Sequence, residues 1–546
     1  MSGFSLPSTL EGAALITPVV MLLACLSRRL QDRMPSLLWL APVPALVASL
    51  LGSGSPPLVL DLAPYRITLE LDLSGAMLLG VAALLWIAAG VYASRYMRGK
   101  PHTGRFVVCW LLTLTGNIGV FITADLASFY LAFALVSIPA YGFLIHDGTS
   151  RAERAGAIYM ALTLLGETLL LLAFVLLAAA APGRSLLIQD CRAALPASPW
   201  RDATLALLIG GFGLKAGLVP LHFWMPLTYT AAPVPAAAVL SGAVVKAGVI
   251  GLTRFLPISH GLPGWGLALA SVGLLSAFYG VAVGVTQANP KTVLAYSSVS
   301  QMGLIAAVAG MGLANGDRGA EIAAAFYAAH HVLAKGALFL VIGVVATTGS
   351  ARLWPVFLPA AVLTLGLGGL PLTGGALAKL AVKETLGNGA VGLLATLSAA
   401  GSTLLMLHFL HCLRNTAVRD AKEVARSGLV PPWLAMAIAA VIVPWVLYFA
   451  AGVGGLSEVL SLAGLWAALL PTLVGGLLWI GLRRWAQFLP DIPEGDIAVA
   501  SEAVTRASVA WGSVLEHADT VLRRWPVACL SLLIVAIILG ALMLAG

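Results

Sequence analysis

Charged residues are scarce in this sequence of 546 residues: only 10% are charged, while 60% belong to the hydrophobic class. An ordinary soluble domain carries about 25% charged residues, so the scarcity excludes a soluble protein. Apolar stretches long enough to cross a bilayer, which takes about 20 residues, recur from residue 12 to residue 545. They lack the polar–apolar alternation of membrane β-barrel strands. We therefore expect an all-α polytopic membrane protein.

Cysteine is also rare, and the five cysteines are scattered, with no pair at the spacing of zinc or iron–sulfur sites. A nucleotide-binding loop and a haem ligand pair are missing as well. His408 and His411 share a helix face, but no third metal ligand stands at a suitable spacing. We therefore expect no metal or other cofactor on this chain. The net charge of +8 is explained by loop placement, and a nucleic-acid partner is not implied.

The long apolar runs predict about 16 transmembrane helices. They lie near residues 12–27, 36–52, 75–97, 106–123, 125–146, 155–181, 203–224, 233–254, 263–285, 292–312, 321–347, 354–386, 389–413, 431–451, 456–482 and 526–545. Residues 57–72 alternate in polarity and are rich in strand formers, which predicts a small external hairpin. Residues 496–524 carry apolar residues at helical spacing, which predicts an amphipathic helix on the membrane surface.

Basic residues test the orientation of these helices. With the N-terminus outside, the inner loops hold 20 basic residues and the outer loops only 6. This split follows the positive-inside rule, so we expect both termini outside, in a bacterial inner membrane. The other five basic residues are all lysines within or at the edge of apolar runs, although the chain has only eight lysines: Lys215, Lys246, Lys335, Lys379 and Lys383.

These five lysines are the most informative residues, because a charge at the bilayer centre costs roughly 2.5 to 3.5 kcal/mol. Arginine stays charged, whereas a buried lysine loses and regains a proton as its surroundings change. Lysine is therefore the basic residue suited to proton transfer. The alternative is that a lysine near the end of a span extends its ammonium to the membrane surface. That alternative is strongest for Lys383.

Other titratable residues in the same regions are possible partners. Glu167 has no charged residue within ten positions, so it is either paired with a buried lysine or protonated and bonded to backbone. His222 follows a proline in VPLHFWMP, and His330 and His331 lie one turn before Lys335. An isolated histidine is more often a core hydrogen-bond donor than a proton carrier. His331 and Lys335, at i and i+4 on one helix face, form a better candidate pair.

Two spans look interrupted by proline and glycine, at Pro220 and Pro233 in the first and at Pro371 in the second. Broken membrane helices expose backbone groups and mark ion sites in transporters. The breaks fall in the seventh and twelfth predicted spans. An odd shift of five spans reverses orientation, which indicates two inverted five-helix repeats. The predicted domains are N-terminal helices with the hairpin (1–105), the first repeat (106–254), the second repeat (263–413), additional helices (414–482), an amphipathic segment (483–525) and a C-terminal helix (526–546).

Four ordered motifs carry a family resemblance: the run FGLKAGLVPLHFWMPLTYTAAPVPAAAVLSGAVVKAGVIGLTRF, then PKTVLAYSSVSQMG, AFYAAHHVLAKGALFL and GLPLTGGALAK. They resemble the antiporter-like membrane subunits of complex I, energy-converting hydrogenases and Mrp-type cation/proton antiporters, over about residues 75–415. The resemblance implies a 14-helix core and a proton relay. In that relay Lys215, Lys246, the pair His331 and Lys335, and Lys379 take the places of the family's lysines and histidine.

One departure from the family concerns the fifth span, where members usually carry a glutamate and this chain has Ala134. Glu167 on the next span is a candidate replacement, which favours the hydrogenase-like branch. Tyr327 stands where many members have a histidine. We expect a proton-translocating subunit of a larger oxidoreductase of the quinone or hydrogenase type. Its partners would be other membrane subunits and a peripheral redox module. The alternatives are a sodium/proton antiporter subunit and a membrane scaffold that does not pump.

Overall fold

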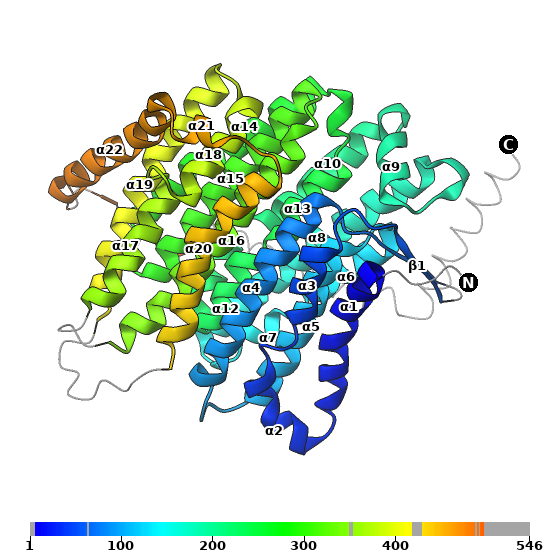
Figure 1. The fold of residues 1–546 in the computed structure, drawn as a ribbon, viewed down its shortest axis with the longest axis horizontal. Coiled ribbons are helices and arrows are strands. Elements are labelled where there is room, and N and C mark those ends of the chain that lie inside the picture. Colours follow the sequence, from blue (N-terminus) through cyan, green and yellow to red (C-terminus); the bar gives the residue numbers. More distant parts are fainter. Residues whose placement is uncertain are drawn as a thin grey trace, which may run out of the picture. The chain divides into compact units, whose positions relative to one another are not determined.

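The computed structural model describes residues 6–62, 65–348, 353–417, 428–485, 487, 489–490 and 492–495. Within these residues the chain is a bundle of long helices with one small hairpin (Figure 1). Eleven helical segments there are long and apolar enough to cross a membrane. The all-α membrane fold is confirmed, and the total of about 16 helices stays a prediction. The predicted surface helix 496–524 and the last span 526–545 lie outside the described residues.

The N-terminal part begins with three helices and the hairpin. Its elements are α1 (Leu6–Ala24), α2 (Arg28–Leu37), α3 (Val43–Leu51), β1 (Leu58–Leu62) and β2 (Tyr65–Leu69). The predicted span 36–52 is shorter than expected, because a turn ending in Pro42 separates α2 from α3. The two strands pair antiparallel, with Leu60 opposite Ile67, which confirms the hairpin.

The next group contains four longer helices and one short helix. It comprises α4 (Leu73–Tyr96), α5 (Thr103–Ile122), α6 (Leu126–Ser137), α7 (Tyr141–Leu144) and α8 (Ser150–Ala180). The side chain of Asp125 accepts hydrogen bonds from Ser128 N at the start of α6 and from Thr68 N in β2, both at 2.8 Å. This one carboxylate therefore caps a helix and holds the hairpin against it. The fifth predicted span is interrupted near Pro139, between α6 and α7.

The first interrupted span and the span after it form the centre of the first half. The elements are α9 (Ile188–Ala194), α10 (Arg201–Ala216), α11 (Trp224–Ala231), α12 (Val234–Val239), a π-helical turn (Leu240–Val244) and α13 (Lys246–Phe255). Gly217 ends α10 in the left-handed conformation, with φ 76°, as is common after a helix. The break predicted around Pro220 is confirmed, and Pro233 separates α11 from α12.

The second half has the second interrupted span. Its elements are α14 (Pro263–Gly284), α15 (Pro290–Asn315), α16 (Gly319–Ala346), α17 (Trp354–Gly368), α18 (Gly374–Leu386), α19 (Ala390–Asn415), α20 (Val430–Ala450), α21 (Leu456–Val459) and α22 (Leu462–Trp485). The break predicted at Pro371 is confirmed between α17 and α18. Helix α14 packs on α15 through glycines: a Cβ on Gly273 would lie 2.5 Å from the carbonyl oxygen of Gly303.

Helix α16 lies inside the bundle, packed against α4, α12, α15, α18 and α20 (Figure 1). The membrane-length windows of α15 and α16 are fully buried, whereas only 17% of the window in α22 is buried. Exposed leucines such as Leu171, Leu172 and Leu477 lie on α8 and α22, where lipid is the expected neighbour. The interior helices α13, α15 and α16 therefore carry the polar residues described next.

Candidate functional site

Lys246 and His331 form the closest contact between two titratable side chains in the middle of the bundle. The ammonium nitrogen Nζ of Lys246 lies 2.6 Å from Nδ1 of His331, and both residues are 0% exposed. Lys246 also donates to the carbonyl oxygen of Ser241, at 3.2 Å. Its helix begins directly after the π-helical turn, where Val245 N donates to Leu240 O, five residues back. A π-helical turn is frequently found at a functional site.

Lys335, one turn along α16, is connected to this pair through hydroxyl groups. Its Nζ donates to the carbonyl oxygen of Leu294 on α15, at 2.8 Å. The same oxygen accepts from the hydroxyl of Ser298 at 3.0 Å, and that hydroxyl lies 2.9 Å from the hydroxyl of Ser241. One carbonyl and two serine hydroxyls therefore join the surroundings of the two lysines. Because Lys246 and Lys335 are both 0% exposed, neither faces lipid.

The partner of His331 differs from the one expected from sequence. The spacing favoured His331 with Lys335 on one helix face, whereas the structure pairs His331 with Lys246, 85 residues away. A single sequence carries local periodicity and no record of this long-range contact. Ser241 and Ser298 were also missed, because a serine in an apolar span usually bonds to its own helix backbone.

Lys215 occupies the last turn of α10, just before the first break. Its Nζ donates to the hydroxyl of Ser137 at 2.8 Å and lies 5.7 Å and 5.9 Å from the ring centroids of Phe133 and Tyr159. Ser137 ends α6 one turn after Ala134, so the fifth span supplies a hydroxyl where a glutamate was expected. Ser137 was not predicted, because an uncharged serine in an apolar span gives no sign of a lysine partner.

Glu167 is 5% exposed and lines the same cavity as Lys215 and Ser137. The cavity has a volume of about 10 Å³, which is the space of roughly one water molecule. Among the described residues neither carboxylate oxygen of Glu167 has a hydrogen-bond donor, and no ion pair joins it to Lys215. The geometry thus allows a water-bridged contact between Glu167 and Lys215, with Ser137 beside them.

His222 and Pro220 lie in the turn between α10 and α11, where the Val219–Pro220 peptide bond is cis. The ring of His222 packs against Tyr279 of α14 with centroids 4.9 Å apart, and 6.2 Å from the ring of Tyr296 of α15. His222 therefore lies where the first break meets α14 and α15. It is 0% exposed.

His330 faces the second break instead of Lys246. With Thr373 and Gly374 it lines a cavity of about 10 Å³, and in the described part of the chain neither ring nitrogen has a hydrogen-bond partner. A Cβ on Gly374 would lie 2.6 Å from Nδ1 of His330, so only glycine leaves room for the ring. Successive residues on a helix point about 100° apart. His330 and His331 therefore face opposite halves of the bundle.

Lys379 of α18 closes the second break. Its Nζ donates to the carbonyl oxygen of Gly368, the last residue of α17, which also accepts from the hydroxyl of Thr403 at 3.3 Å. This carbonyl has no helical donor, because its helix ends at the break before Pro371. Lys383, one turn further on, is exposed, in agreement with the alternative of an ammonium at the membrane surface.

A second polar row was not predicted. The hydroxyl of Tyr327 donates to Gln301 Oε1 at 2.7 Å, and Gln301 Nε2 donates to the hydroxyl of Ser402 at 2.9 Å. All three side chains are buried, and they join α16, α15 and α19. Tyr327, which departs from the family pattern, therefore has a hydrogen-bonded place in the core. The signal in the sequence was the polar run YSSVSQ within an otherwise apolar helix.

On the hairpin side of the bundle, two ion pairs line a cavity of about 290 Å³. Asp72 and Arg254 pair at 2.7 Å, and Arg192 and Glu321 at 3.0 Å. Burial alone would raise the pKa of Asp72, but the guanidinium of Arg254 and the hydrogen bond from Gly75 N bring that pKa below its usual value. Helix α13 runs from this cavity to Lys246, and α16 runs from it to His331.

In the part of the chain that the structure describes, no three His, Cys, Asp or Glu side chains are grouped for a metal ion. His408 Nε2 lies 2.7 Å from the carbonyl oxygen of Gln287. The contacts around the two helix breaks and between Lys246 and Lys335 thus involve buried lysine, histidine and serine side chains, with Glu167 beside Lys215. These groups accept, donate and hold protons.

Comparison with known proteins adds a family pattern and two relatives. The pattern described as "NADH:quinone oxidoreductase/Mrp antiporter, TM" matches residues 123–405. An uncharacterized protein of Mycobacterium tuberculosis (strain CDC 1551 / Oshkosh) is 33% identical over 350 residues, 59% of this chain and 53% of that protein. Hydrogenase-4 component B of Escherichia coli (strain K12) is 29% identical over 295 residues, 51% of this chain and 43% of that protein. The chain therefore spans about half the length of the curated relatives it matches.

One solved structure is similar over nearly the whole chain. A chain of the Mrp complex from Dietzia sp. DQ12-45-1b matches with a TM-score of 0.79 at 20% sequence identity. The match covers 99% of this chain and 63% of that chain. At this identity the likeness shows a shared fold.

Proposed function

The chain belongs to the NADH:quinone oxidoreductase/Mrp antiporter family of membrane subunits, and from that premise we propose that it translocates protons through Lys246, His331 and Lys335. The observation that carries the proposal is the contact of 2.6 Å between Lys246 Nζ and His331 Nδ1 in a fully buried setting. At that distance one proton is transferred between the two nitrogens without rearrangement of either helix.

The linked lysines couple the two ends of the relay. Two ammonium groups repel each other strongly in a core of low dielectric constant, so protonation of Lys246 opposes protonation of Lys335. Ser241 and Ser298 lie between them, and a hydroxyl both accepts and donates a proton. Loading a proton on one side of this arrangement therefore releases a proton from the other.

Lys215 supplies the loading step in this proposal. Ser137 accepts a hydrogen bond from its ammonium, and Glu167 lies in the same cavity with no donor of its own in the described residues. An approach of the Glu167 carboxylate, directly or through one water, stabilises the charged form of Lys215. Withdrawal of the carboxylate sends the proton on toward Lys246. His330 and Lys379 continue the relay into the second half.

The partners we propose are other membrane subunits and a peripheral redox module, with the lipid bilayer around them. Hydrogenase-4 component B is named as a component, and the matched solved chain belongs to the Mrp complex, so both are parts of larger assemblies. The electron chemistry would then belong to the redox module, with this chain acting on protons. A sodium/proton antiporter subunit is the second candidate, because the family pattern includes Mrp antiporters.

The test is proton uptake by inside-out membrane vesicles from cells that make the full chain with its neighbouring subunits. We expect Lys246→Ala and Lys335→Ala to abolish uptake, and Lys215→Ala to do the same. Lys383→Ala is the matched control, since Lys383 is exposed on α18, and it should keep wild-type uptake. Co-purification of the partner subunits checks assembly in each variant.

Three results would change the proposal. Wild-type uptake in Lys335→Ala vesicles with intact assembly would exclude the relay and favour a membrane scaffold that does not pump protons. Uptake that requires sodium on the opposite side would favour the antiporter. Equal loss in Lys383→Ala and Lys335→Ala would show that the assay reports general damage and not the buried relay.

A further inference from the structure

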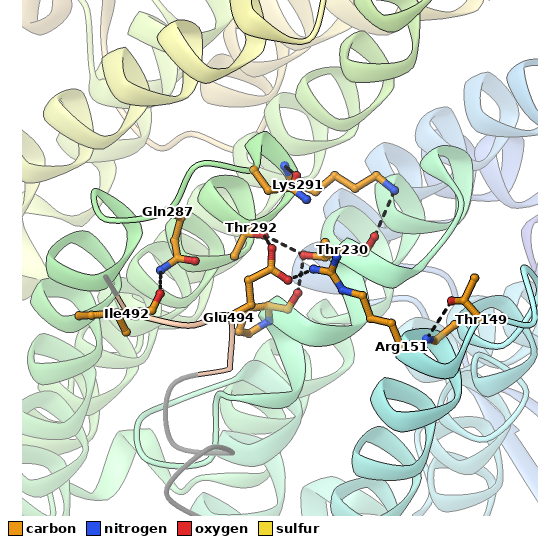
Figure 2. A network of polar contacts seen from close by, with 11 residues as sticks. Thr149, Arg151, Thr230, Gln287, Lys291, Thr292, Ile492 and Glu494 are labelled. Atoms are coloured by element: carbon orange, nitrogen blue, oxygen red, sulfur yellow. Dashed lines mark hydrogen bonds and ion pairs between the residues drawn. The ribbon is translucent and has the colours of Figure 1, made fainter. Parts of the chain in front are cut away.

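Residues 492–494, called the C-terminal segment below, contact residues at the beginnings of two helices, α8 and α15 (Figure 2). The carbonyl oxygen of Ile492 accepts from Gln287 Nε2 at 3.0 Å. Glu494, two residues on, forms an ion pair with Arg151 in the first turn of α8, and its Oε1 accepts from the hydroxyl of Thr292 at 2.8 Å. The C-terminal segment thus contacts the first turns of α8 and α15 and the loop before α15.

Thr292 connects Glu494 with the first helix break. The hydroxyl of Thr292 lies 3.0 Å from the hydroxyl of Thr230, in the last turn of α11, and Thr292 is 0% exposed. Beside it, Lys291 Nζ donates to the carbonyl oxygen of Ala232 at 2.7 Å and of Thr230 at 3.4 Å. The end of the interrupted span, the start of α15 and the C-terminal segment therefore meet in one polar cluster (Figure 2).

This cluster adjoins the buried relay. Thr292 stands two residues before Leu294 on α15, about 3 Å along the helix axis, and the carbonyl oxygen of Leu294 accepts from Lys335. The Glu494 side chain is 23% exposed and the Arg151 side chain 59% exposed. Glu494 therefore lies between water on one side and the fully buried Thr292 on the other.

We propose that Glu494 is the group of this polar cluster that collects protons from water, and that it passes them by way of Thr292 toward Lys335. This inference rests on the proton translocation proposed above. Arg151 pairs with the Glu494 carboxylate, the form of the side chain that accepts a proton, and the exposed Arg151 side chain has room to swing away when the proton arrives. The other charged groups around the cluster are Lys291, with Lys100 and Asp147 near it.

The transfer balances as one proton and no electrons. Hydronium on the water side gives a proton to a carboxylate oxygen of Glu494, and water is left. The hydroxyl of Thr292, which donates to Glu494 Oε1 in this structure, turns away from Glu494. The new carboxylic O–H then donates to the hydroxyl oxygen of Thr292, and the hydroxyl's own proton leaves toward Lys335. Glu494 returns to the carboxylate and pairs with Arg151 again. Lys335 has gained the proton that the bulk water lost.

The experiment measures proton uptake against external pH in inside-out vesicles of the full assembly, which turn the arginine-rich side outward under the predicted orientation. Right-side-out vesicles serve as the comparison, because they expose the opposite face of the protein to the external pH. We expect Glu494→Gln to slow uptake about a hundredfold, the lower range for a positioned proton-transfer group, and Glu494→Asp to retain part of it. Arg151→Ala should keep uptake but move its half-maximal pH up by about one unit, because Glu494 then loses its cationic neighbour.

Two controls separate proton collection from simple clamping of the segment. Gln287→Ala removes the bond to Ile492 and leaves Glu494 unchanged, while Glu153→Gln removes an exposed carboxylate from the first turn of α8. Both should keep the wild-type pH profile. Equal loss in Gln287→Ala and Glu494→Gln would mean that the segment only clamps the helices, and so would overturn the inference.

The inference and the proposed function fail in different ways. Wild-type uptake in Glu494→Gln vesicles, with uptake abolished in Lys335→Ala vesicles, would remove Glu494 from the path and keep the relay. A pH response confined to right-side-out vesicles would place the collecting group on the other face and would also overturn the inference.

Discussion

At the scale of single residues, the site depends on uncharged groups as much as on charges. Ser137 accepts from Lys215, and Ser241 and Ser298 lie between Lys246 and Lys335. A buried ammonium without an acceptor is costly, so each hydroxyl or carbonyl oxygen makes a buried lysine tolerable. Glu167 then remains free to act on the lysine from across a cavity of about one water.

The replacement of the missing fifth-span carboxylate is testable at this scale. Glu167→Gln keeps the size of the side chain and removes its charge, so proton uptake should fall by about tenfold or more, since the pKa of a buried lysine responds to an opposite charge nearby by 1 to 3 units. Adding Ala134→Glu should restore part of the uptake, because Ala134 stands one turn before Ser137 on α6.

Vesicle uptake measures both variants, with Glu153→Gln as the control for loss of an exposed carboxylate. Full proton uptake by the Glu167→Gln variant would contradict the hypothesis that Glu167 replaces the missing fifth-span glutamate. The Lys246, His331 and Lys335 relay would stand without it.

Most of these residues could be predicted from one physical quantity, the free-energy cost of a charge in the membrane. That cost selected Lys215, Lys246, Lys335 and Lys379, which the structure buries or places at a helix break. The contacts between these residues could not be predicted from the sequence. His331 pairs with a lysine 85 positions away, and no local period encodes that contact.

At the scale of elements, glycine and proline decided where helices stop, and the two interrupted spans were predicted correctly. The split of the predicted second span and the π-helical turn before Lys246 were not predicted. A π-helical turn adds one residue to a helical turn, and the apolar residues from Leu240 to Val244 give no periodic sign of it. Packing on neighbouring helices decides such a feature.

The second break requires a glycine at position 374, and adding a single methyl group there tests this requirement. Gly374→Ala would place a Cβ 2.6 Å from Nδ1 of His330 and 2.7 Å from Cγ of Pro444. We expect a loss of about 1 to 3 kcal/mol of stability from this overpacking, together with slower proton uptake, because the His330 ring must move. Thermal unfolding of the purified assembly and vesicle uptake measure the two effects.

Gly476→Ala is the control, since nothing lies within 4 Å of the added Cβ on α22. A Gly374→Ala protein as stable and as active as wild type would show that the break opens easily enough to accept a side chain.

At the scale of the whole molecule, composition alone fixed the class of the protein. Few charges and long apolar runs indicate a membrane protein, and the lack of polar–apolar alternation leaves helices as the spanning elements. The long-range ties between elements were not visible in the sequence. Asp72, at the start of α4, pairs with Arg254, 182 residues later at the end of α13.

This ion pair predicts how stability depends on pH. The pKa of Asp72 in the folded protein lies below its usual value, so the pair stabilises the fold above the unfolded pKa of about 3.9 and is lost as the pH falls through the folded pKa. Asp72→Asn should therefore lower stability at pH 7 by about 1 kcal/mol, a modest effect because the Asp72 side chain is 45% exposed.

Thermal unfolding at pH 7 and near pH 3 measures the effect, and the difference between wild type and Asp72→Asn should shrink at the lower pH. Asp61→Asn is the control, since the Asp61 side chain is 81% exposed in its pair with Arg66. A difference that grew on acidification would contradict the assigned sign.

The two adjacent histidines on α16 have a consequence for timing. His331 contacts Lys246, and His330 sits against Gly374 at the second break, yet both rings are fixed to one stretch of backbone. Any shift of α16 that lengthens the first contact also displaces the second ring. The backbone of α16 therefore couples the Lys246 contact mechanically to the second break, so a displacement at one would be transmitted to the other.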